Sequence, residues 1–128
     1  MSPIMMSLLL QASLVAPGPQ TFEAAQRASA VNQQPLVVTI GATWCPACVE
    51  LEKRVLPKLA EQGHLANVVR YHVDVDRERA LAAKLLKGNS IPQMVRIEKT
   101  PQGWQASRLI GLPSTKKVKD FVDGKVTD

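Results

Sequence analysis

The two cysteines of the chain, Cys45 and Cys48, are separated by two residues. An apolar, β-branched segment (36–40) precedes them, and apolar residues at helical spacing follow from Val49, so a strand, a short turn and a helix are predicted. Cys45 then lies at the start of the helix, with Pro46 in the first helical position, where a missing N–H has no cost. The free N–H groups of a helix start stabilise an anion, so this thiol is predicted to be more acidic than a free cysteine.

Cys48 lies about one turn further along this helix and shares a face with Leu51 and Val55, which directs it toward the protein interior. The pattern therefore predicts one exposed, activated sulfur and a sheltered second sulfur within reach. Such a dithiol attacks the disulfide of another molecule through Cys45 and releases the mixed disulfide through Cys48. No cofactor is implied, because the two sulfurs carry the chemistry themselves.

Other interpretations of a C-x-x-C pair are a zinc site, a haem attachment site and a structural disulfide. A zinc site needs four ligands, and only His64 and His72 remain to complete one, so no metal site is predicted. Haem attachment needs a histidine directly after the second cysteine, where Val49 stands. A short structural disulfide stays open, because exported proteins contain such bonds, although the redox dithiol is favoured over it.

The composition is that of an ordinary globular domain. At 128 residues the chain is long enough for one domain with a single core. The net charge is +5, but the basic residues are spread among acidic ones, and the densest cluster (116–119) has no interleaved aromatic residue. Nucleic-acid binding is therefore not expected. We expect a monomer.

Residues 1–19 contain no charged side chain. The apolar run 4–10, followed by 14–16, resembles the core of a secretory signal, although no Lys or Arg precedes it. The run is too short and too interrupted by polar residues for a convincing transmembrane helix. An export signal is favoured, which predicts a periplasmic or otherwise exported protein. A cytoplasmic leader and an uncleaved membrane anchor stay open.

The rest of the chain supplies the elements that position the cysteines. They are a helix over 22–31 capped by Thr21, the buried central strand 36–40, a helix after the cysteines that breaks near Pro57, a half-buried strand over 69–75, a helix over 77–87 capped by Asp76, a hairpin of 93–98 with 104–110, and a last helix capped by Ser114. This order predicts an α/β fold with a central mixed sheet of four to five strands and helices on both faces. His64 and His72 are expected to be ordinary surface histidines.

The segment Trp44-Cys45-Pro46-Ala47-Cys48 at a strand-to-helix junction resembles the active site of the thioredoxin superfamily. An Ile91–Pro92 pair 43 residues after the second cysteine, and Gly111 after the following hairpin, are similar to further positions of the family. The resemblance covers residues 20–124, and leaves 1–19 as a leader with linker and 125–128 as a tail. It is nearest to bacterial exported members and to the C-terminal domain of the membrane-bound thiol:disulfide interchange reductases.

This resemblance implies a thioredoxin-like fold and a thiol–disulfide oxidoreductase, in which Cys45 is the nucleophile and Cys48 resolves the mixed disulfide. It also implies a cis Ile91–Pro92 bond that lies against the cysteines and exposes the backbone of residue 91 to an extended substrate. The residues expected to bind substrate are Trp44, Pro46, Ala47, Ile91, Pro92 and Gly111.

The implied partners are protein thiols and disulfides, together with an upstream electron donor or acceptor. Reduction of disulfides outside the cytoplasm is favoured over oxidative folding. The alternative is a non-catalytic thioredoxin-like binding module with a structural disulfide.

Two positions depart from the pattern of the family. Thioredoxins carry a buried aspartate in the strand before the motif, which is thought to exchange protons with the second cysteine, and Thr39 occupies the matching position here. A hydroxyl cannot act as a base near neutral pH, so Cys48 needs water or another group. Glu50 and Glu52 are expected on the helix surface, which makes either a poor base for this step. The central dipeptide is Pro-Ala rather than Gly-Pro, so the reduction potential cannot be carried over.

Overall fold

The computed structural model describes residues 18–125, so the predictions for residues 1–17 and 126–128 lie outside the described residues. The elements follow the order α1 (Phe22–Asn32), β1 (Leu36–Gly41), α2 (Pro46–Glu50), η3 (Leu51–Val55), α3 (Leu56–Glu61), β2 (Val69–Asp74), α4 (Arg79–Leu85), β3 (Gln93–Thr100), β4 (Gly103–Ile110) and α5 (Thr115–Val122). Within this range no helix is both long and apolar enough to cross a membrane. The predicted order of helices and strands is confirmed.

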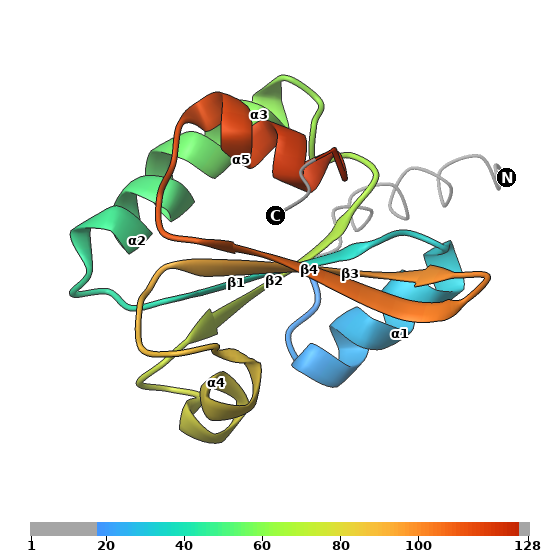
Figure 1. Ribbon diagram of the computed structural model, residues 1–128, viewed down its shortest axis with the longest axis horizontal. Helices are drawn as coiled ribbons and strands as arrows, with labels where there is room; N and C mark the ends of the chain where they lie inside the picture. Colours follow the sequence, from blue (N-terminus) through green and yellow to red (C-terminus); the bar gives the residue numbers. More distant parts are fainter. Residues whose placement is uncertain (1–17, 126–128) are drawn as a thin grey trace, which may run out of the picture.

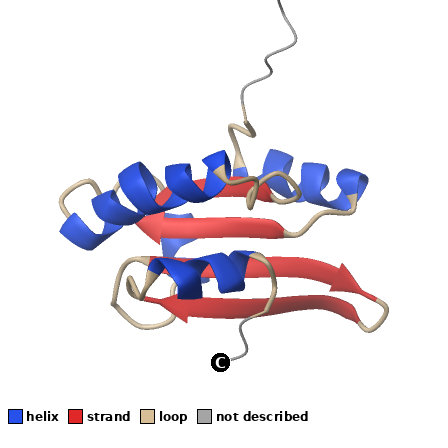
Figure 2. Cartoon of the chain, turned by 90° about the horizontal axis from the view of Figure 1, so that it is seen from above, coloured by secondary structure: helices blue, strands red, loops and turns tan. Residues whose placement is uncertain are grey.

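The four strands form one mixed sheet in the order β2-β1-β3-β4 (Figure 2). β1 runs parallel to β2 and antiparallel to β3, and β4 pairs antiparallel with β3. Every residue of β1 is buried, as predicted from its apolar sequence, because helices cover both faces of a central strand. The strand that leads to the cysteines is thus the most sheltered strand of the sheet.

Helices cover both faces of the sheet (Figure 1). The helical segments α2 and α3 that follow the cysteines, together with α5, lie on one face, and Val37 packs with them. On the other face, α1 and α4 pack against Leu36, Val38 and Ile40. Because side chains alternate along a strand, Thr39 shares the face of Val37 and points toward the helix that carries the cysteines.

The helix after the cysteines differs from its prediction, which placed a break near Pro57. The chain stays helical from Pro46 to Glu61, with one π-helical turn over Leu51–Val55. In this wide turn the N–H of Leu56 donates to the carbonyl of Leu51. Pro57 follows at the start of α3, where its missing N–H is tolerated. A wide turn thus replaces the break.

The helix ends show which capping predictions are correct. Thr21 and Ser114 accept hydrogen bonds from the backbone of the first turns of α1 and α5, as predicted. The prediction that Asp76 caps α4 is wrong. The Asp74 carboxylate instead accepts from the N–H groups of Asp76 and Arg77, so the chain makes a turn before α4 begins.

Candidate active site

Cys45 and Cys48 lie just beyond the buried strand β1 and are joined by a disulfide bond. Cys45 is the N-cap of α2, and Pro46 opens the helix, so the predicted strand, turn and helix are confirmed. The N–H of Cys48 donates to Cys45 Sγ across 3.2 Å. This donor and the helix start both stabilise negative charge on that sulfur when the bond is reduced.

Both sulfurs are more covered than the sequence pattern predicts. Cys45 is 7% exposed and Cys48 is 3% exposed, so the prediction of an exposed Cys45 is wrong for this disulfide state. The two residues pack in a small apolar cluster with Ala42, against Ala47 and Ile91. The order of accessibility is as predicted, because Cys45 is the less buried of the pair.

The Ile91–Pro92 peptide bond is cis, as the resemblance implied, and Pro92 is buried. The carbonyl oxygen of Ile91 lies 3.9 Å from Cys45 Sγ. The carbonyl of Pro92 accepts the N–H of Gly111 across 2.8 Å, and Gly111 has a φ of +85°, a conformation that glycine adopts most readily. The structure therefore brings Ile91 against Cys45 and Gly111 beside the proline.

Gln93 holds this loop in place, a role that no prediction from the sequence assigns to it. Its side chain is fully buried. The amide oxygen accepts from the N–H of Lys87 (3.1 Å) and from Arg108 Nη1 (2.7 Å). The amide nitrogen donates to the carbonyls of Lys87 and Ser90, each across 2.8 Å. The available signal was a polar residue between Ile91–Pro92 and the apolar pair Met94 and Val95.

Trp44 stands beside the cysteines with 67% of its surface exposed. Its indole Nε1 donates to Asp76 Oδ2 across 2.8 Å, which ties the ring to the loop after β2. Pro46 is exposed and Ala47 is half-buried. An exposed aromatic ring with one fixed edge offers apolar area without a large loss of side-chain freedom.

Thr39, Glu52 and His72 form a polar cluster behind Cys48. Thr39 Oγ1 donates to Glu52 Oε1 across 2.5 Å and lies 2.9 Å from His72 Nδ1. The same carboxylate oxygen lies 2.7 Å from His72 Nδ1, and the other oxygen accepts from Arg70 Nη2 across 3.2 Å. The prediction that Glu52 lies on the helix surface is therefore wrong. His72 is exposed, as predicted, but it contacts Thr39 and Glu52 rather than standing alone on the surface.

The sequence held two signals for this cluster. Glu52 follows Cys48 by four residues, a spacing that places both on one helix face. Thr39 and His72 are register partners on the parallel strands β1 and β2. The first signal could have been read from the sequence, whereas the second needs the strand register.

A hollow of about 360 Å³ lies between this cluster and Cys48. Its lining consists of Ala42, Thr43, Cys48, Val49, Glu52, Lys53 and His72. Gly41 lets the backbone of β1 pass close to both residues, because a Cβ there would lie 3.0 Å from Cys48 Sγ and 3.8 Å from His72 Cε1. Cys48 and His72 therefore border the same small space.

A family model described as a thioredoxin-like domain matches residues 22–123. The chain belongs to the thioredoxin-like family. The predicted fold and family are thus confirmed. No curated protein matches the chain in sequence.

Solved structures of thioredoxins share the fold. Chloroplastic thioredoxin z is 26% identical, with a TM-score of 0.67 over 88% of this chain and 96% of its own. The germline-specific thioredoxin Deadhead from Drosophila melanogaster is 22% identical, with a TM-score of 0.64 over 87% of this chain and 100% of its own. Trichomonas vaginalis thioredoxin is 25% identical, with a TM-score of 0.62 over 81% of this chain and 90% of its own.

The polar cluster of this thioredoxin-like protein shifts the pKa values of its members. Burial favours the neutral form of Glu52, but hydrogen bonds from His72 and Thr39 and the charges of His72 and Arg70 outweigh it and lower the pKa of Glu52 to about 2. The hydrogen bond to Glu52 raises the pKa of His72 against the opposing effect of burial. Asp74 adds to the rise and Arg70 opposes it.

These shifts predict a stability that depends on pH. The ionised Glu52 stabilises the fold above the ordinary carboxyl pKa of 4.5, and this contribution is lost as the pH falls toward about 2. Protonated His72 also stabilises the fold, but with the opposite pH dependence. Its contribution is complete below pH 6.5 and is lost as the pH rises through the raised pKa of His72. Glu52 and His72 together therefore stabilise the protein most between about pH 4.5 and pH 6.5.

We expect Glu52→Gln to have a lower free energy of unfolding than the parent near pH 5.5. The difference between the two proteins should shrink by about 2 kcal/mol near pH 2.5. Urea unfolding at both pH values measures the two free energies. Glu50→Gln is the matched control, because Glu50 forms an exposed ion pair with Arg54 that contributes little. A gap that stays constant with pH in the Glu52 variant would contradict the assigned pKa.

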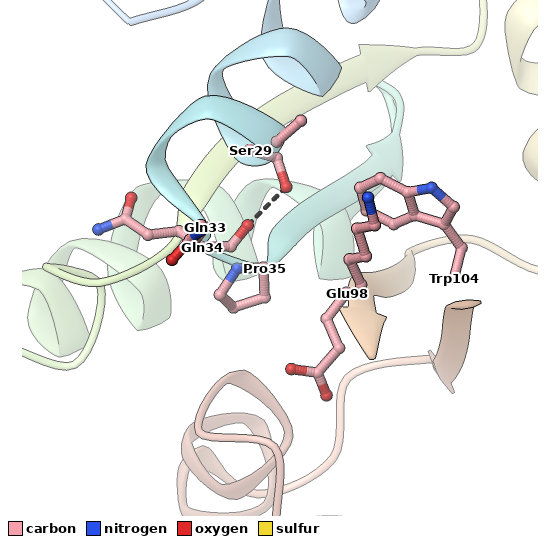
Figure 3. A pocket seen from close by; sticks show the side chains of 8 residues that line it. Ser29, Gln33, Gln34, Pro35, Glu98 and Trp104 are labelled. Carbon is pink, nitrogen blue, oxygen red and sulfur yellow. Dashed lines mark hydrogen bonds between the residues drawn. The ribbon is translucent and has the colours of Figure 1, made fainter. Parts of the chain in front are cut away.

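A second hollow, of about 270 Å³, lies at the other end of β1 (Figure 3). Its lining consists of Ser29, Ala30, Gln33, Gln34, Pro35, Glu98, Lys99 and Trp104. Pro35 precedes the first residue of β1, whereas the cysteines follow its last, so the strand separates the two places. The Ser29 hydroxyl donates to the carbonyl of Gln34, and no sulfur lines this space. It therefore takes no part in the chemistry of the cysteine pair.

Proposed function

We propose that this protein is a thiol–disulfide oxidoreductase that exchanges disulfides with protein substrates through Cys45 and Cys48. The observation that carries the proposal is the setting of Cys45. Its sulfur accepts a hydrogen bond from the N–H of Cys48 at a helix start, and the Ile91 carbonyl oxygen lies 3.9 Å from the same sulfur. A thiolate is therefore stabilised directly beside a backbone that an extended peptide could pair with.

The proposed reaction has two steps. The Cys45 thiolate attacks one sulfur of a substrate disulfide, which forms a mixed disulfide and releases the other substrate sulfur as a thiolate that takes up a proton. Cys48 then loses its proton and attacks Cys45 Sγ. This forms the Cys45–Cys48 bond and releases the second substrate thiol. The substrate gains two electrons and the cysteine pair loses two, so an upstream donor must reduce the pair again.

We further propose that the protein works as a reductant outside the cytoplasm. The absence of charge from residues 1–19 and the apolar run 4–10 support export, and the resemblance to exported members of the family supports reduction. The proposed surface for substrates consists of Trp44, Pro46, Ala47, Ile91, Pro92 and Gly111. Trp44 and Pro46 are the exposed members of this set, and the others lie deeper.

A redox titration tests the proposal. The full chain is equilibrated in graded thiol buffers, and the fraction of reduced Cys45 and Cys48 is read by alkylation and mass spectrometry. A potential near roughly −270 mV, as in thioredoxin, would support the reductive direction. A value near about −120 mV would contradict the reductive direction and mark an oxidant. A cysteine pair that stays oxidised at potentials well below about −300 mV would overturn the proposed enzymatic function and support a binding module with a structural disulfide.

A further inference from the structure

The second step of the proposed reaction requires a proton acceptor for Cys48, and the inference here rests on that proposed function. Thr39, at the position of the family's buried aspartate, carries a hydroxyl that cannot accept a proton near neutral pH. Its hydroxyl instead donates to Glu52, which in turn contacts His72. The structure therefore replaces one buried acid by three side chains from β1, η3 and β2.

The contacts of His72 determine which of its ring nitrogens can accept a proton. Nδ1 lies 2.7 Å from a carboxylate oxygen of Glu52, which can only accept hydrogen bonds, so Nδ1 carries the hydrogen in the neutral ring. Nε2 is then the basic nitrogen. Among residues 18–125 no group forms a hydrogen bond with Nε2, and 40% of the His72 side chain is exposed, so water reaches the ring.

Glu52 is not itself suited to accept the proton. Thr39, His72 and Arg70 hydrogen-bond its two oxygens, and these partners hold the pKa of Glu52 far below neutral pH. A carboxylate this acidic returns a proton at once to solvent at neutral pH. Its effect on the neighbouring imidazole is the opposite, because a fixed negative charge beside Nδ1–H makes Nε2 a stronger base.

We propose that His72 accepts the proton of Cys48 through water in the hollow that both residues border, with Glu52 and Thr39 as positioning residues. The hollow of about 360 Å³ has room for several waters, each of which takes up about 30 Å³ in the liquid. The Cys48 S–H proton passes to a water, and that water gives a proton to His72 Nε2. The Cys48 thiolate attacks Cys45 Sγ, the bond to the substrate sulfur breaks, and His72 later returns its proton to solvent.

Four charged groups surround His72 and set the pH range of this step. Glu52 from η3 and Asp74 on β2 favour the protonated ring, and Arg70 on β2 opposes it. Lys53, from η3, lines the same hollow. Removal of the imidazole should therefore change the pH dependence of the second step, rather than only its rate at one pH.

The experiment separates the two steps with the aromatic disulfide 5,5′-dithiobis(2-nitrobenzoate). Attack by Cys45 on this probe releases one coloured thiolate, and the resolution by Cys48 releases the second. Stopped-flow absorbance of the reduced full chain follows both releases over a range of pH. Because the released thiolate needs no proton, the second phase reports the deprotonation of Cys48.

We expect His72→Gln to slow the second release at least about tenfold at pH values above the raised pKa of His72, where the parent imidazole is neutral and can accept a proton, since a positioned base contributes two or more orders of magnitude in favourable cases. Its pH profile should move toward the ordinary thiol pKa of about 8.5. The first release should stay within about twofold of the parent. Glu52→Gln should change the second release in the same direction, because it leaves the imidazole in place without its carboxylate.

Two matched controls accompany these variants. His64→Gln removes the other histidine, which lies 3.8 Å from Asp123, and Glu50→Gln removes the neighbouring exposed carboxylate; both should leave both releases unchanged. A second release in His72→Gln with the parental rate and pH profile would overturn the role of His72 and leave the proposed function intact. A parent protein that releases only one thiolate would overturn the proposed function itself.

Discussion

Replacement of Cys48 by serine should stop turnover and trap protein substrates on Cys45 as mixed disulfides. Cys45 keeps its place at the helix start, so it still attacks a substrate disulfide. The second sulfur, which would release the substrate, is then missing. We expect the rate of disulfide reduction to fall at least ~10³-fold, because the remaining residues cannot complete the cycle. Non-reducing gels and mass spectrometry of the variant would identify the trapped adducts.

Cys45→Ser is the matched variant, and it should be as inactive without trapping any substrate. Cys48 is 3% exposed against 7% for Cys45 and does not stand at the helix start, so it should react with a substrate disulfide far more slowly. Adducts on Cys48 in the Cys45→Ser protein would show that the two roles are reversed. Partner binding that survives both substitutions without adducts would instead support a binding module.

Local sequence signals predicted the frame of the fold. The unbroken apolar run of β1, the C-x-x-C pair after it and the capping residues Thr21 and Ser114 each depend on neighbours within a few residues. Those interactions are short in sequence, so periodicity and composition reveal them. The Pro57 prediction failed because a π-helical turn absorbs the missing N–H without ending the helix, and composition does not distinguish the two outcomes.

The polar cluster depends on contacts between residues that are distant in sequence. Thr39 and His72 are 33 residues apart, and their contact exists only because β1 and β2 pair in one particular register. A shift of one residue would turn His72 to the other face of the sheet. Glu52 was assigned to the surface because the sequence shows which residues share its helix face but not what packs against that face.

The burial of Cys45 was missed for a similar reason. The helix pattern places its sulfur at the start of α2, where solvent would reach it. The loop that contains Ile91 comes from 46 residues later in the chain and covers the sulfur. What lies over a residue follows from tertiary packing, so the loop before β3 decides how far a substrate must approach to reach the nucleophile.

Gln93→Leu should lower the free energy of unfolding by about 2 to 4 kcal/mol. The leucine side chain is similar in size, but it cannot form the hydrogen bonds that Gln93 makes with Lys87, Ser90 and Arg108. Each lost bond costs about 1 kcal/mol, and backbone groups left without a partner cost more where water cannot replace it. Urea unfolding, followed by circular dichroism, measures the loss.

The same substitution should also slow the attack of Cys45, because the loop that ends in Pro92 is anchored through the Gln93 amide. Gln105→Leu on β4 is the matched control: it makes the same change of side chain at an exposed strand position and should alter stability by less than about 0.5 kcal/mol. If Gln93→Leu lowers stability while the first release from the aromatic disulfide keeps its parental rate, Gln93 stabilises the fold without positioning the loop. A decrease in both the stability and the rate of the first release would show that one buried amide couples the strand β3 to the reactivity of the cysteine pair.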